Sequence, residues 1–354
     1  MSNWPDTRLL DLFGIQQPII QGPMAGATTL AMMVGVAKAG GLGSLPAAML
    51  TPEQIRQQTE AFRRAVQAPL NINFFCHQPP TPDPEREKRW KERLAPYYRE
   101  QGLDFNAPTP VSSRAPFDET SCQLVEELRP EIVSFHFGLP PKPLLDRVKA
   151  TGALIIGCAT TVDEARWLQE RGCNAIIAMG NEAGGHRGIF LSNDLNTQVG
   201  TIALVPQIVD AVKVPVIAAG GIGDARGIAA AFMLGASAVQ LGTSYLFTPE
   251  AKISASHQQA LRTAKESETA LTNLFTGRPA RGIMNRAMRE LGPISDMAPA
   301  FPLAGGALMP LRAKGEADFS NLWSGQALRL AVELPAEELT RQLAQQALIR
   351  LTGH

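Results

Sequence analysis

Eight short apolar runs recur along the chain, and each ends in glycine, proline or a small polar residue. The runs are 18–26, 41–46, 69–75, 131–140, 153–161, 175–180, 214–221 and 238–247. Stretches with apolar residues three and four positions apart lie between them, at 28–40, 51–66, 142–152, 161–172 and 224–235. Short buried strands that alternate with amphipathic helices predict a parallel sheet of the α/β class, and eight such units fit a (β/α)8 TIM barrel. A doubly wound open sheet is the alternative.

Two parts of the chain depart from this alternation. Residues 77–125 interrupt the third unit with prolines, charges and one polar helix near 84–101. Long connections are often functional, so we interpret this one as a segment that forms part of the rim or a lid at the catalytic face of the barrel. A plain surface insertion is the alternative. Helical patterns after the eighth run predict a small, mainly helical second domain. The expected domains are a barrel over 1–250, a substrate-side domain over 251–320, and C-terminal helices over 321–354 that pack back on the barrel.

The composition excludes several classes of protein. Lys plus Arg equals Asp plus Glu at 33 each, so the net charge is zero and no nucleic-acid partner is expected. No apolar run reaches the length of a membrane span, and the first residues lack the blocks of a signal peptide. Four cysteines without metal-ligand spacing are expected to be reduced thiols of a cytoplasmic protein without a metal: Cys76, Cys122, Cys158 and Cys173. The oligomeric state stays open, and a homodimer is compatible with the sequence.

Glycines follow the seventh and eighth runs, where a barrel often binds phosphate. Residues 220–223 read Gly-Gly-Ile-Gly and precede Asp224, at which a helix is expected to begin, and Gly242-Thr243 follows the next run. Backbone N–H groups at a helix start bind anions, and the loops after strands seven and eight of barrels frequently hold a phosphate. Two tight turns without a ligand are the alternative.

The first and third runs end in residues that suit a planar ring. Pro23 stiffens the bend after the first run, and Met24 offers a soft apolar group. Asn71 and Asn73 share one face of the third run, and an amide can both donate and accept toward the edge of a heterocycle. The alternatives are a plain turn and two asparagines that bond neighbouring strands.

Two of the five histidines are expected at the mouth of the barrel. His136 ends the fourth run, and His186 lies just beyond the sixth, in the glycine-rich stretch NEAGGHRG. Histidine is the natural proton carrier near neutral pH, so this pair predicts a catalytic site. His77 opens the long connection and is a weaker candidate, whereas His257 and His354 are expected at the surface.

The order of the motifs resembles the nitronate monooxygenases, formerly called 2-nitropropane dioxygenases, over nearly the whole chain. The motifs are IIQGPMAG, PLNINFFCH, SFHFGLP and NEAGGHRG, followed by AAGGIGDARGIAAAFMLGASAVQLGT. QGPM, GGLGSL and EAGGH alone would fit a wider superfamily that includes flavin-dependent enoyl-carrier-protein reductases. PLNINFFCH and SFHFGLP point to the class I bacterial enzymes.

The resemblance implies an FMN cofactor and assigns residues to it. Pro23 and Met24 would back the isoalloxazine ring, Asn73 would meet its edge, and Gly184 would line the approach to it. The residues matched to the ribityl phosphate are Gly221, Gln240, Leu241, Gly242 and Thr243.

The same resemblance assigns the catalytic groups. His186 matches the family's catalytic histidine, and His136 matches its second active-site histidine, which would help to hold the nitro oxygens. The chain departs from the family at Met179, where a glutamine that touches the flavin is common. Methionine cannot donate the same hydrogen bond.

By resemblance, the expected activity is FMN-dependent oxidation of alkyl nitronates by O2 to a carbonyl compound and nitrite. Propionate 3-nitronate is the expected physiological substrate, and no nicotinamide is needed because the substrate supplies the electrons. One alternative is an FMN-dependent NAD(P)H reductase of enoyl thioesters or quinones on the same fold. The other is a barrel that binds a phosphorylated ligand without catalysis.

Overall fold

The computed structural model of the protein describes residues 4–110, 114–314 and 317–353. Eight parallel strands form one sheet in the order β1-β9-β8-β6-β5-β4-β3-β2. The strands are β1 Ile19–Gln21, β2 Gly43–Pro46, β3 Leu70–Phe75, β4 Ile132–His136, β5 Leu154–Ala159, β6 Ala175–Met179, β8 Val216–Ala219 and β9 Ala238–Leu241. A bridge between Ile20 and Leu42 joins the two ends of this order. The sheet is therefore a TIM barrel, each of the eight predicted runs contains one strand, and the open-sheet alternative is wrong.

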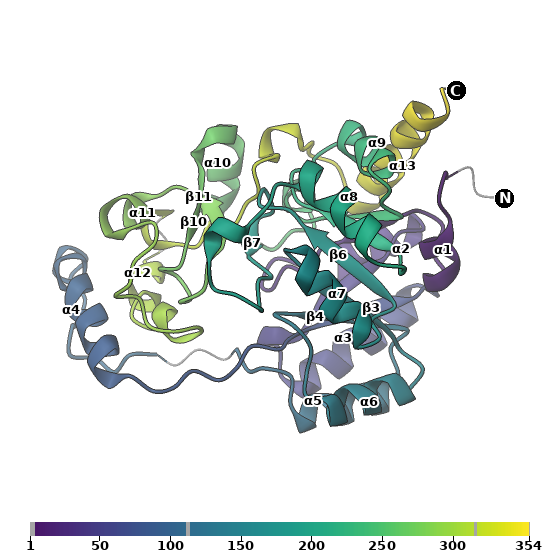
Figure 1. Cartoon of the computed structure of the whole chain (residues 1–354). Coiled ribbons are helices and arrows are strands. Elements are labelled where there is room, and N and C mark those ends of the chain that lie inside the picture. The colour runs from purple at the N-terminus through teal and green to yellow at the C-terminus, as the bar shows by residue number, and fades with distance from the viewer. Residues whose placement is uncertain (1–3, 111–113, 315–316, 354) are drawn as a thin grey trace.

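Helices surround the barrel (Figure 1). They are α2 Leu30–Lys38, α3 Pro52–Ala65, α5 Glu119–Leu128, α6 Lys142–Ala150, α7 Val162–Glu170, α8 Thr201–Ala211 and α9 Ala225–Met233. Polar N-cap side chains accept a hydrogen bond from the first turn of α2, α3, α5, α7 and α9. Thr51 and Gln54 form a reciprocal capping box on α3, and Asp224 accepts a hydrogen bond from the Arg226 N–H at the start of α9.

Two terminal helices complete the barrel wall. The short helix α1 spans Arg8–Phe13, and α13 spans Ala336–Thr352. The last helix lies against α2 and α9, so the C-terminal segment packs back on the barrel. No helix in the described ranges is long and apolar enough to cross a membrane.

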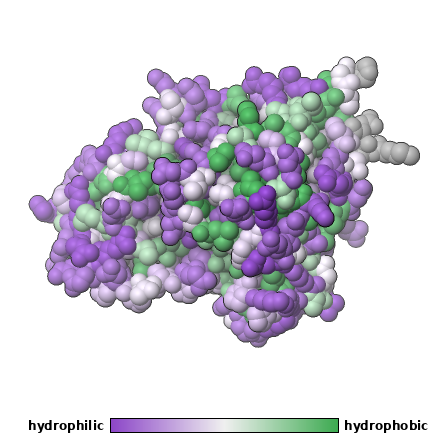
Figure 2. Space-filling model, in the orientation of Figure 1, coloured by the Kyte–Doolittle hydropathy of each residue, from purple (hydrophilic) through white to green (hydrophobic). Residues whose placement is uncertain are grey.

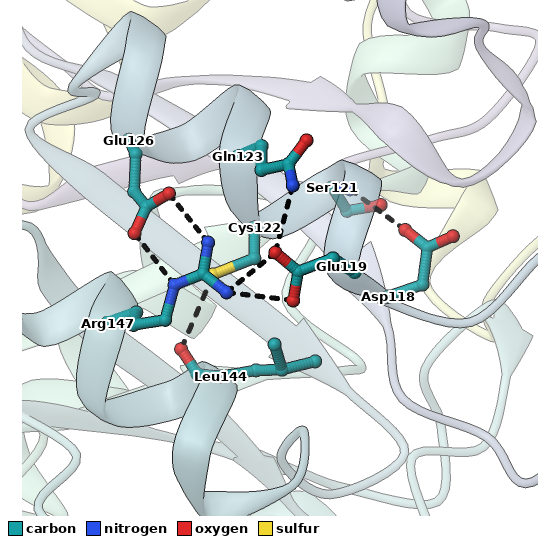
Figure 3. Close-up of polar contacts among 8 residues, drawn as sticks. All are labelled: Asp118, Glu119, Ser121, Cys122, Gln123, Glu126, Leu144 and Arg147. Atoms are coloured by element: carbon teal, nitrogen blue, oxygen red, sulfur yellow. Dashed lines mark hydrogen bonds and ion pairs between the residues drawn. The ribbon is translucent and has the colours of Figure 1, made fainter.

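An ion-pair network on the outer wall fixes α5 to α6 (Figure 3). The Arg147 guanidinium of α6 lies 2.8 Å from the Glu126 carboxylate and 2.7 Å from the Glu119 carboxylate, both on α5. These pairs are solvent-exposed, so their contribution is mainly to orientation rather than to stability. Helix α5 begins within the predicted insertion 77–125, yet it packs between α3 and α6 as the third barrel helix. The segment that leaves the barrel therefore ends at the start of α5.

That segment carries α4, Pro84–Glu100, close to the predicted polar helix. In Figure 1 it reaches away from the barrel to the side where α11 and α12 lie. Trp90 donates to the Ala304 carbonyl at 3.0 Å, and Tyr98 donates to the Ala307 carbonyl at 2.6 Å. The aromatic face of α4 thus belongs to the core of the small domain. The domain boundaries inferred from the sequence stay a prediction.

The small domain is not purely helical. It contains α10 Ala255–Thr263, α11 Arg286–Leu291 and α12 Met309–Arg312. It also contains a three-stranded antiparallel sheet in the order β10-β11-β7, with β10 Thr269–Thr272, β11 Ala280–Ile283 and β7 Gly185–His186. The sequence pattern did not predict this sheet because its strands, GH, TALT and ARGI, are not apolar runs. The strand β7 comes from the barrel loop after β6, so it links the two parts of the molecule.

Apolar side chains reach the surface on the face drawn in Figure 2 only as patches among hydrophilic ones. The four cysteines are free thiols and all are buried. Burial raises the pKa of Cys158 and of Cys173 to about 12, so neither is a nucleophile at neutral pH.

Candidate active site

A cavity of about 760 Å³ opens at the carboxyl ends of the barrel strands. This volume lies in the range of cofactor and substrate pockets. Eleven of the twelve predicted site residues line it: Pro23, Met24, Asn73, His136, Met179, Gly184, His186, Gly221, Gln240, Gly242 and Thr243. Leu241 is the exception among them, because its side chain is buried and its backbone carbonyl accepts a hydrogen bond from the Gly22 N–H.

The loops after β8 and β9 form a cradle of free backbone donors. The N–H groups of Gly221, Gly242 and Thr243 make no hydrogen bond to another described residue. A Cβ built on Gly242 meets only the Met24 sulfur, at 3.9 Å, so open space lies in front of this loop. The Ser244 hydroxyl donates to the Gly223 carbonyl at 3.2 Å and ties the two loops together. Unpaired N–H groups facing open space suit an anion such as a phosphate.

A segment near the C-terminus covers one side of this cradle and was not predicted from the sequence. The Gly325 N–H donates to the Thr243 hydroxyl at 2.9 Å, and the Gln326 N–H donates to the Glu182 carbonyl at 3.0 Å. A Cβ on Gly184 would lie 2.5 Å from the Gly325 nitrogen, so only glycine fits there. The sequence WSGQ at 323–326 carries a glycine between polar residues, but nothing in its spacing links it to a loop more than 130 residues earlier.

The two asparagines of β3 hydrogen-bond to neighbouring strands. Asn71 donates to the Ser44 hydroxyl of β2 at 3.0 Å, and Asn73 donates to the Ser134 hydroxyl of β4 at 2.9 Å. They therefore bond neighbouring strands. Asn73 also lines the cavity, where its side chain is fixed by Ser134 and can meet a bound ring.

The backbone around His186 is held from both sides. The β7–β11 ladder pairs His186 with Ala280, and the Arg187 N–H donates to the Pro279 carbonyl at 2.9 Å. The Arg187 guanidinium is fully buried and donates to the Met179 carbonyl at 2.8 Å and to the Gly180 carbonyl. The glycine-rich loop is thus clamped to the end of β6 by its own arginine.

The two predicted histidines are adjacent. His136 Nε2 lies 3.2 Å from the His186 carbonyl oxygen, and because a carbonyl only accepts, Nε2 of His136 is the donor. His186 Nε2 lies 3.0 Å from the Thr276 hydroxyl. The rings of Phe75, Phe137 and Phe301 lie 4.4–6.1 Å from one or both imidazoles and form an apolar wall.

Burial and nearby cations keep both histidines neutral. Burial lowers the pKa of His136 to about 4, and the charges of Arg278 and Arg187 act in the same direction. Burial, Arg114, His136 and Arg278 hold the pKa of His186 well below 6.5. Both rings are therefore neutral at neutral pH, and each has one nitrogen that carries a lone pair.

Two further arginines line the cavity and come from segments that the sequence did not connect. Arg114 follows the α4 excursion, and Arg312 ends α12. Burial lowers the pKa of both groups, and in Arg114 the charge of Arg312 adds to this effect, so the two guanidiniums lie near each other. Arg312 has no carboxylate partner among the described residues, which leaves its charge for an anionic ligand.

The remaining histidines correct one expectation. His257 was expected at the surface but is buried, lines the cavity, and its Nε2 donates to the Trp323 carbonyl at 3.1 Å. Its place on α10, which packs over the barrel mouth, explains the difference. His77 is buried beside the site, with its ring 4.7 Å from that of Phe301. His354 lies outside the described residues.

We expect the pH dependence of stability to report on His77. Burial lowers its pKa to about 4, against 6.5 for a free histidine, and its Nδ1 has no partner among the described residues. Between pH 6.5 and about 4 the unfolded chain therefore binds a proton that the folded chain does not, and the free energy of unfolding falls with decreasing pH. His77→Phe should reduce that slope by about 0.7 kcal/mol per pH unit between pH 7 and 6 and by about 1.2 between pH 6 and 5, measured by denaturant unfolding at pH 7, 6 and 5. A slope equal to that of the wild type would contradict this prediction.

Comparison with known proteins places the chain in a family. The sequence model described as nitronate monooxygenase matches residues 6–346. The chain is 41% identical to a nitronate monooxygenase of Pseudomonas aeruginosa, with 96% of this chain and 98% of that protein covered. It is 39% identical to a nitronate monooxygenase of Paraburkholderia phytofirmans, with 95% and 93% covered.

Solved structures agree with the sequence relatives. A structure described as nitroalkane oxidase from Streptomyces ansochromogenes superposes with a TM-score of 0.86 at 36% identity, covering 96% of this chain and 97% of that one. FabK from Thermotoga maritima superposes with a TM-score of 0.74 at 26% identity, covering 96% and 95%.

Proposed function

Because the chain belongs to the nitronate monooxygenase family, we propose that it uses FMN and O2 to oxidise alkyl nitronates to a carbonyl compound and nitrite. The observation that carries this proposal is the pair of neutral histidines in an apolar cavity that also holds two arginines. An anionic nitronate is attracted by the arginines, and a neutral imidazole can remove the α-proton of its nitroalkane precursor.

The cradle fits the proposed cofactor. The free N–H groups of Gly221, Gly242 and Thr243 would bind the phosphate, and Pro23 and Met24 with Asn73 would contact the ring system. When bound, FMN would take electrons from the nitronate and pass them on to O2. The protein's own part is to orient the substrate, exclude water and move the proton.

The two histidines have different proposed roles. The only N–H of neutral His136 is directed at the His186 carbonyl, so His136 orients that loop, and the nitro oxygens need another donor. Arg114 lies close enough to His186 to depress its pKa, and it supplies such a donor. His186 is the proposed base for neutral nitroalkanes.

A purified sample tests the cofactor directly. The protein should be yellow, and acid precipitation should release FMN, identified by chromatography, to the supernatant in close to one equivalent per chain. Release of FAD, or a colourless protein that cannot be reconstituted with FMN, would overturn the proposal. A homodimer and a cytoplasmic location stay predictions.

We expect Arg312 to select substrates with a second negative charge, such as propionate 3-nitronate. Because Arg312 lines the cavity and has no carboxylate partner among the described residues, a substrate carboxylate can pair with it. Arg312→Met should raise KM for propionate 3-nitronate about tenfold and leave KM for ethyl nitronate nearly unchanged. Arg312→Lys should retain most of the preference, and Arg329→Met, an exposed arginine, is the matched control. Equal changes for both substrates would exclude this role.

We expect Met179 to lower the reduction potential of the cofactor relative to relatives with glutamine. Met179 lines the cavity, and its sulfur lies 3.8 Å from the Cys158 sulfur, a contact without a strong donor. Met179→Gln would introduce a hydrogen bond to the reduced, negatively charged ring, worth about 1.5–3 kcal/mol. The two-electron potential should rise by about 30–65 mV in a potentiometric titration. An unchanged or lower potential with FMN still bound would rule out this account.

A further inference from the structure

A threonine of the small domain makes the one hydrogen bond that the His186 ring forms with a side chain in the described part of the chain. Thr276 lies in the turn between β10 and β11, and its hydroxyl is 3.0 Å from Nε2 of His186. The β7–β11 ladder, which pairs His186 with Ala280, brings the ring and the hydroxyl together. Thr276 is 2% exposed, so bulk water does not compete for its hydroxyl.

The hydrogen bonds of the Thr276 hydroxyl determine which ring nitrogen of His186 carries the proton. Besides the contact with His186, the Thr276 hydroxyl donates to the Arg278 carbonyl at 3.3 Å and accepts from the Arg278 N–H at 3.4 Å. A hydroxyl has one hydrogen and two acceptor sites. All three contacts are satisfied together only when Nε2–H of His186 is the donor to Thr276. If Thr276 instead donates to Nε2, the contact with the Arg278 carbonyl is lost.

We propose that Thr276 is a positioning residue that holds His186 in the Nε2–H form, so that Nδ1 carries the lone pair that acts as base. Nδ1 makes no hydrogen bond to any described residue, and the His186 side chain lines the cavity. The low pKa of His186 keeps the ring neutral, as this role requires. The proposal rests on the proposed function for its substrate, but the tautomer is a property of the protein alone.

The step that this arrangement supports is the activation of a neutral nitroalkane. The α-carbon–hydrogen bond breaks, its electron pair forms the carbon–nitrogen double bond of the nitronate, the N=O π pair moves onto a nitro oxygen as negative charge, and the proton moves to Nδ1. The imidazolium that results keeps its Nε2–H bond to Thr276, so the ring does not have to turn during the transfer. A preformed nitronate has already lost this proton and does not need the step.

Two variants separate positioning from a general effect on folding. Thr276→Val has nearly the same shape but lacks all three hydrogen bonds, whereas Thr276→Ser keeps the hydroxyl. We expect Thr276→Val to lower kcat/KM for neutral nitroethane about 3- to 10-fold, the factor of one neutral hydrogen bond, with kcat/KM for ethyl nitronate nearly unchanged. Thr276→Ser should restore the ratio of the two values to that of the wild type.

The tautomer of His186 can be measured by NMR without any turnover. In long-range ¹H–¹⁵N spectra of the holoenzyme with ¹⁵N-labelled histidine, the signals of His186 are those missing from His186→Asn. The wild type and Thr276→Ser should show a protonated Nε2 and a bare Nδ1, and Thr276→Val should show a mixture of the two forms. A protonated Nδ1 in the wild type, or an unchanged spectrum and substrate ratio in Thr276→Val, would overturn the proposal. If nitronate turnover is absent but the spectra are as expected, the proposed function fails and the positioning role stands.

Discussion

We expect His186→Asn to lower kcat/KM for neutral nitroalkanes by about 10²- to 10⁴-fold, the usual contribution of a general base. Asparagine can hydrogen-bond to the substrate but cannot accept the α-proton at neutral pH. The imidazole that it replaces is neutral, because burial and the charge of Arg114 hold its pKa well below 6.5. Preformed nitronates do not need a base, so their kcat/KM should fall by less than about tenfold.

The ratio of the two losses is the informative quantity. Arg329→Met, which alters an exposed side chain, is the control and should leave the ratio unchanged. Equal losses for the neutral and the anionic substrate in His186→Asn would mean that His186 binds the nitro group and does not act as a base.

The second large effect is expected at Gly242, where a side chain would occupy the cofactor's place without disturbing the fold. Its φ is −108°, which any residue can adopt, and an added Cβ has no neighbour closer than 3.9 Å. Gly242→Val should therefore fold normally and weaken FMN binding about 10- to 100-fold, the cost of overfilling a site by 1–3 kcal/mol. Gly242→Ala should show a smaller effect of the same sign.

Fluorescence titration of the apoprotein with FMN measures this change. The thermal midpoint of each apoprotein should match that of the wild type, because the new side chain points into open space. Wild-type affinity for FMN in Gly242→Val would show that the cofactor phosphate does not lie against this loop.

The barrel could be predicted from the sequence because its signals are local. Each strand lies in a short apolar run, and most of these runs are followed by glycine, proline or a small polar residue, so the alternation of strand and helix is visible in the sequence alone. Helix α8 was missed because Pro206 lies inside it, and proline usually ends a helix. The site residues that follow strands were predictable for the same reason, since the carboxyl ends of parallel strands meet at one mouth.

The parts of the site that come from the small domain could not be predicted in this way. Thr276, Arg312 and Arg114 reach the cavity through contacts between segments far apart in the sequence, and none of them lies next to a strand of the barrel. His257 looked like a surface residue because it lies on a polar helix, but that helix covers the barrel mouth. Only the tertiary structure brings these groups to the cavity.

Oxygen uptake with a preformed nitronate, in the absence of NADH and NADPH, directly tests whether the protein oxidises nitronates. We expect the FMN-loaded protein to consume O2 and release nitrite with ethyl nitronate or propionate 3-nitronate as the only other reactant. Negligible nitrite release, together with rapid bleaching of the flavin by NADH under anaerobic conditions, would contradict the account and assign the protein to the reductases of the same fold.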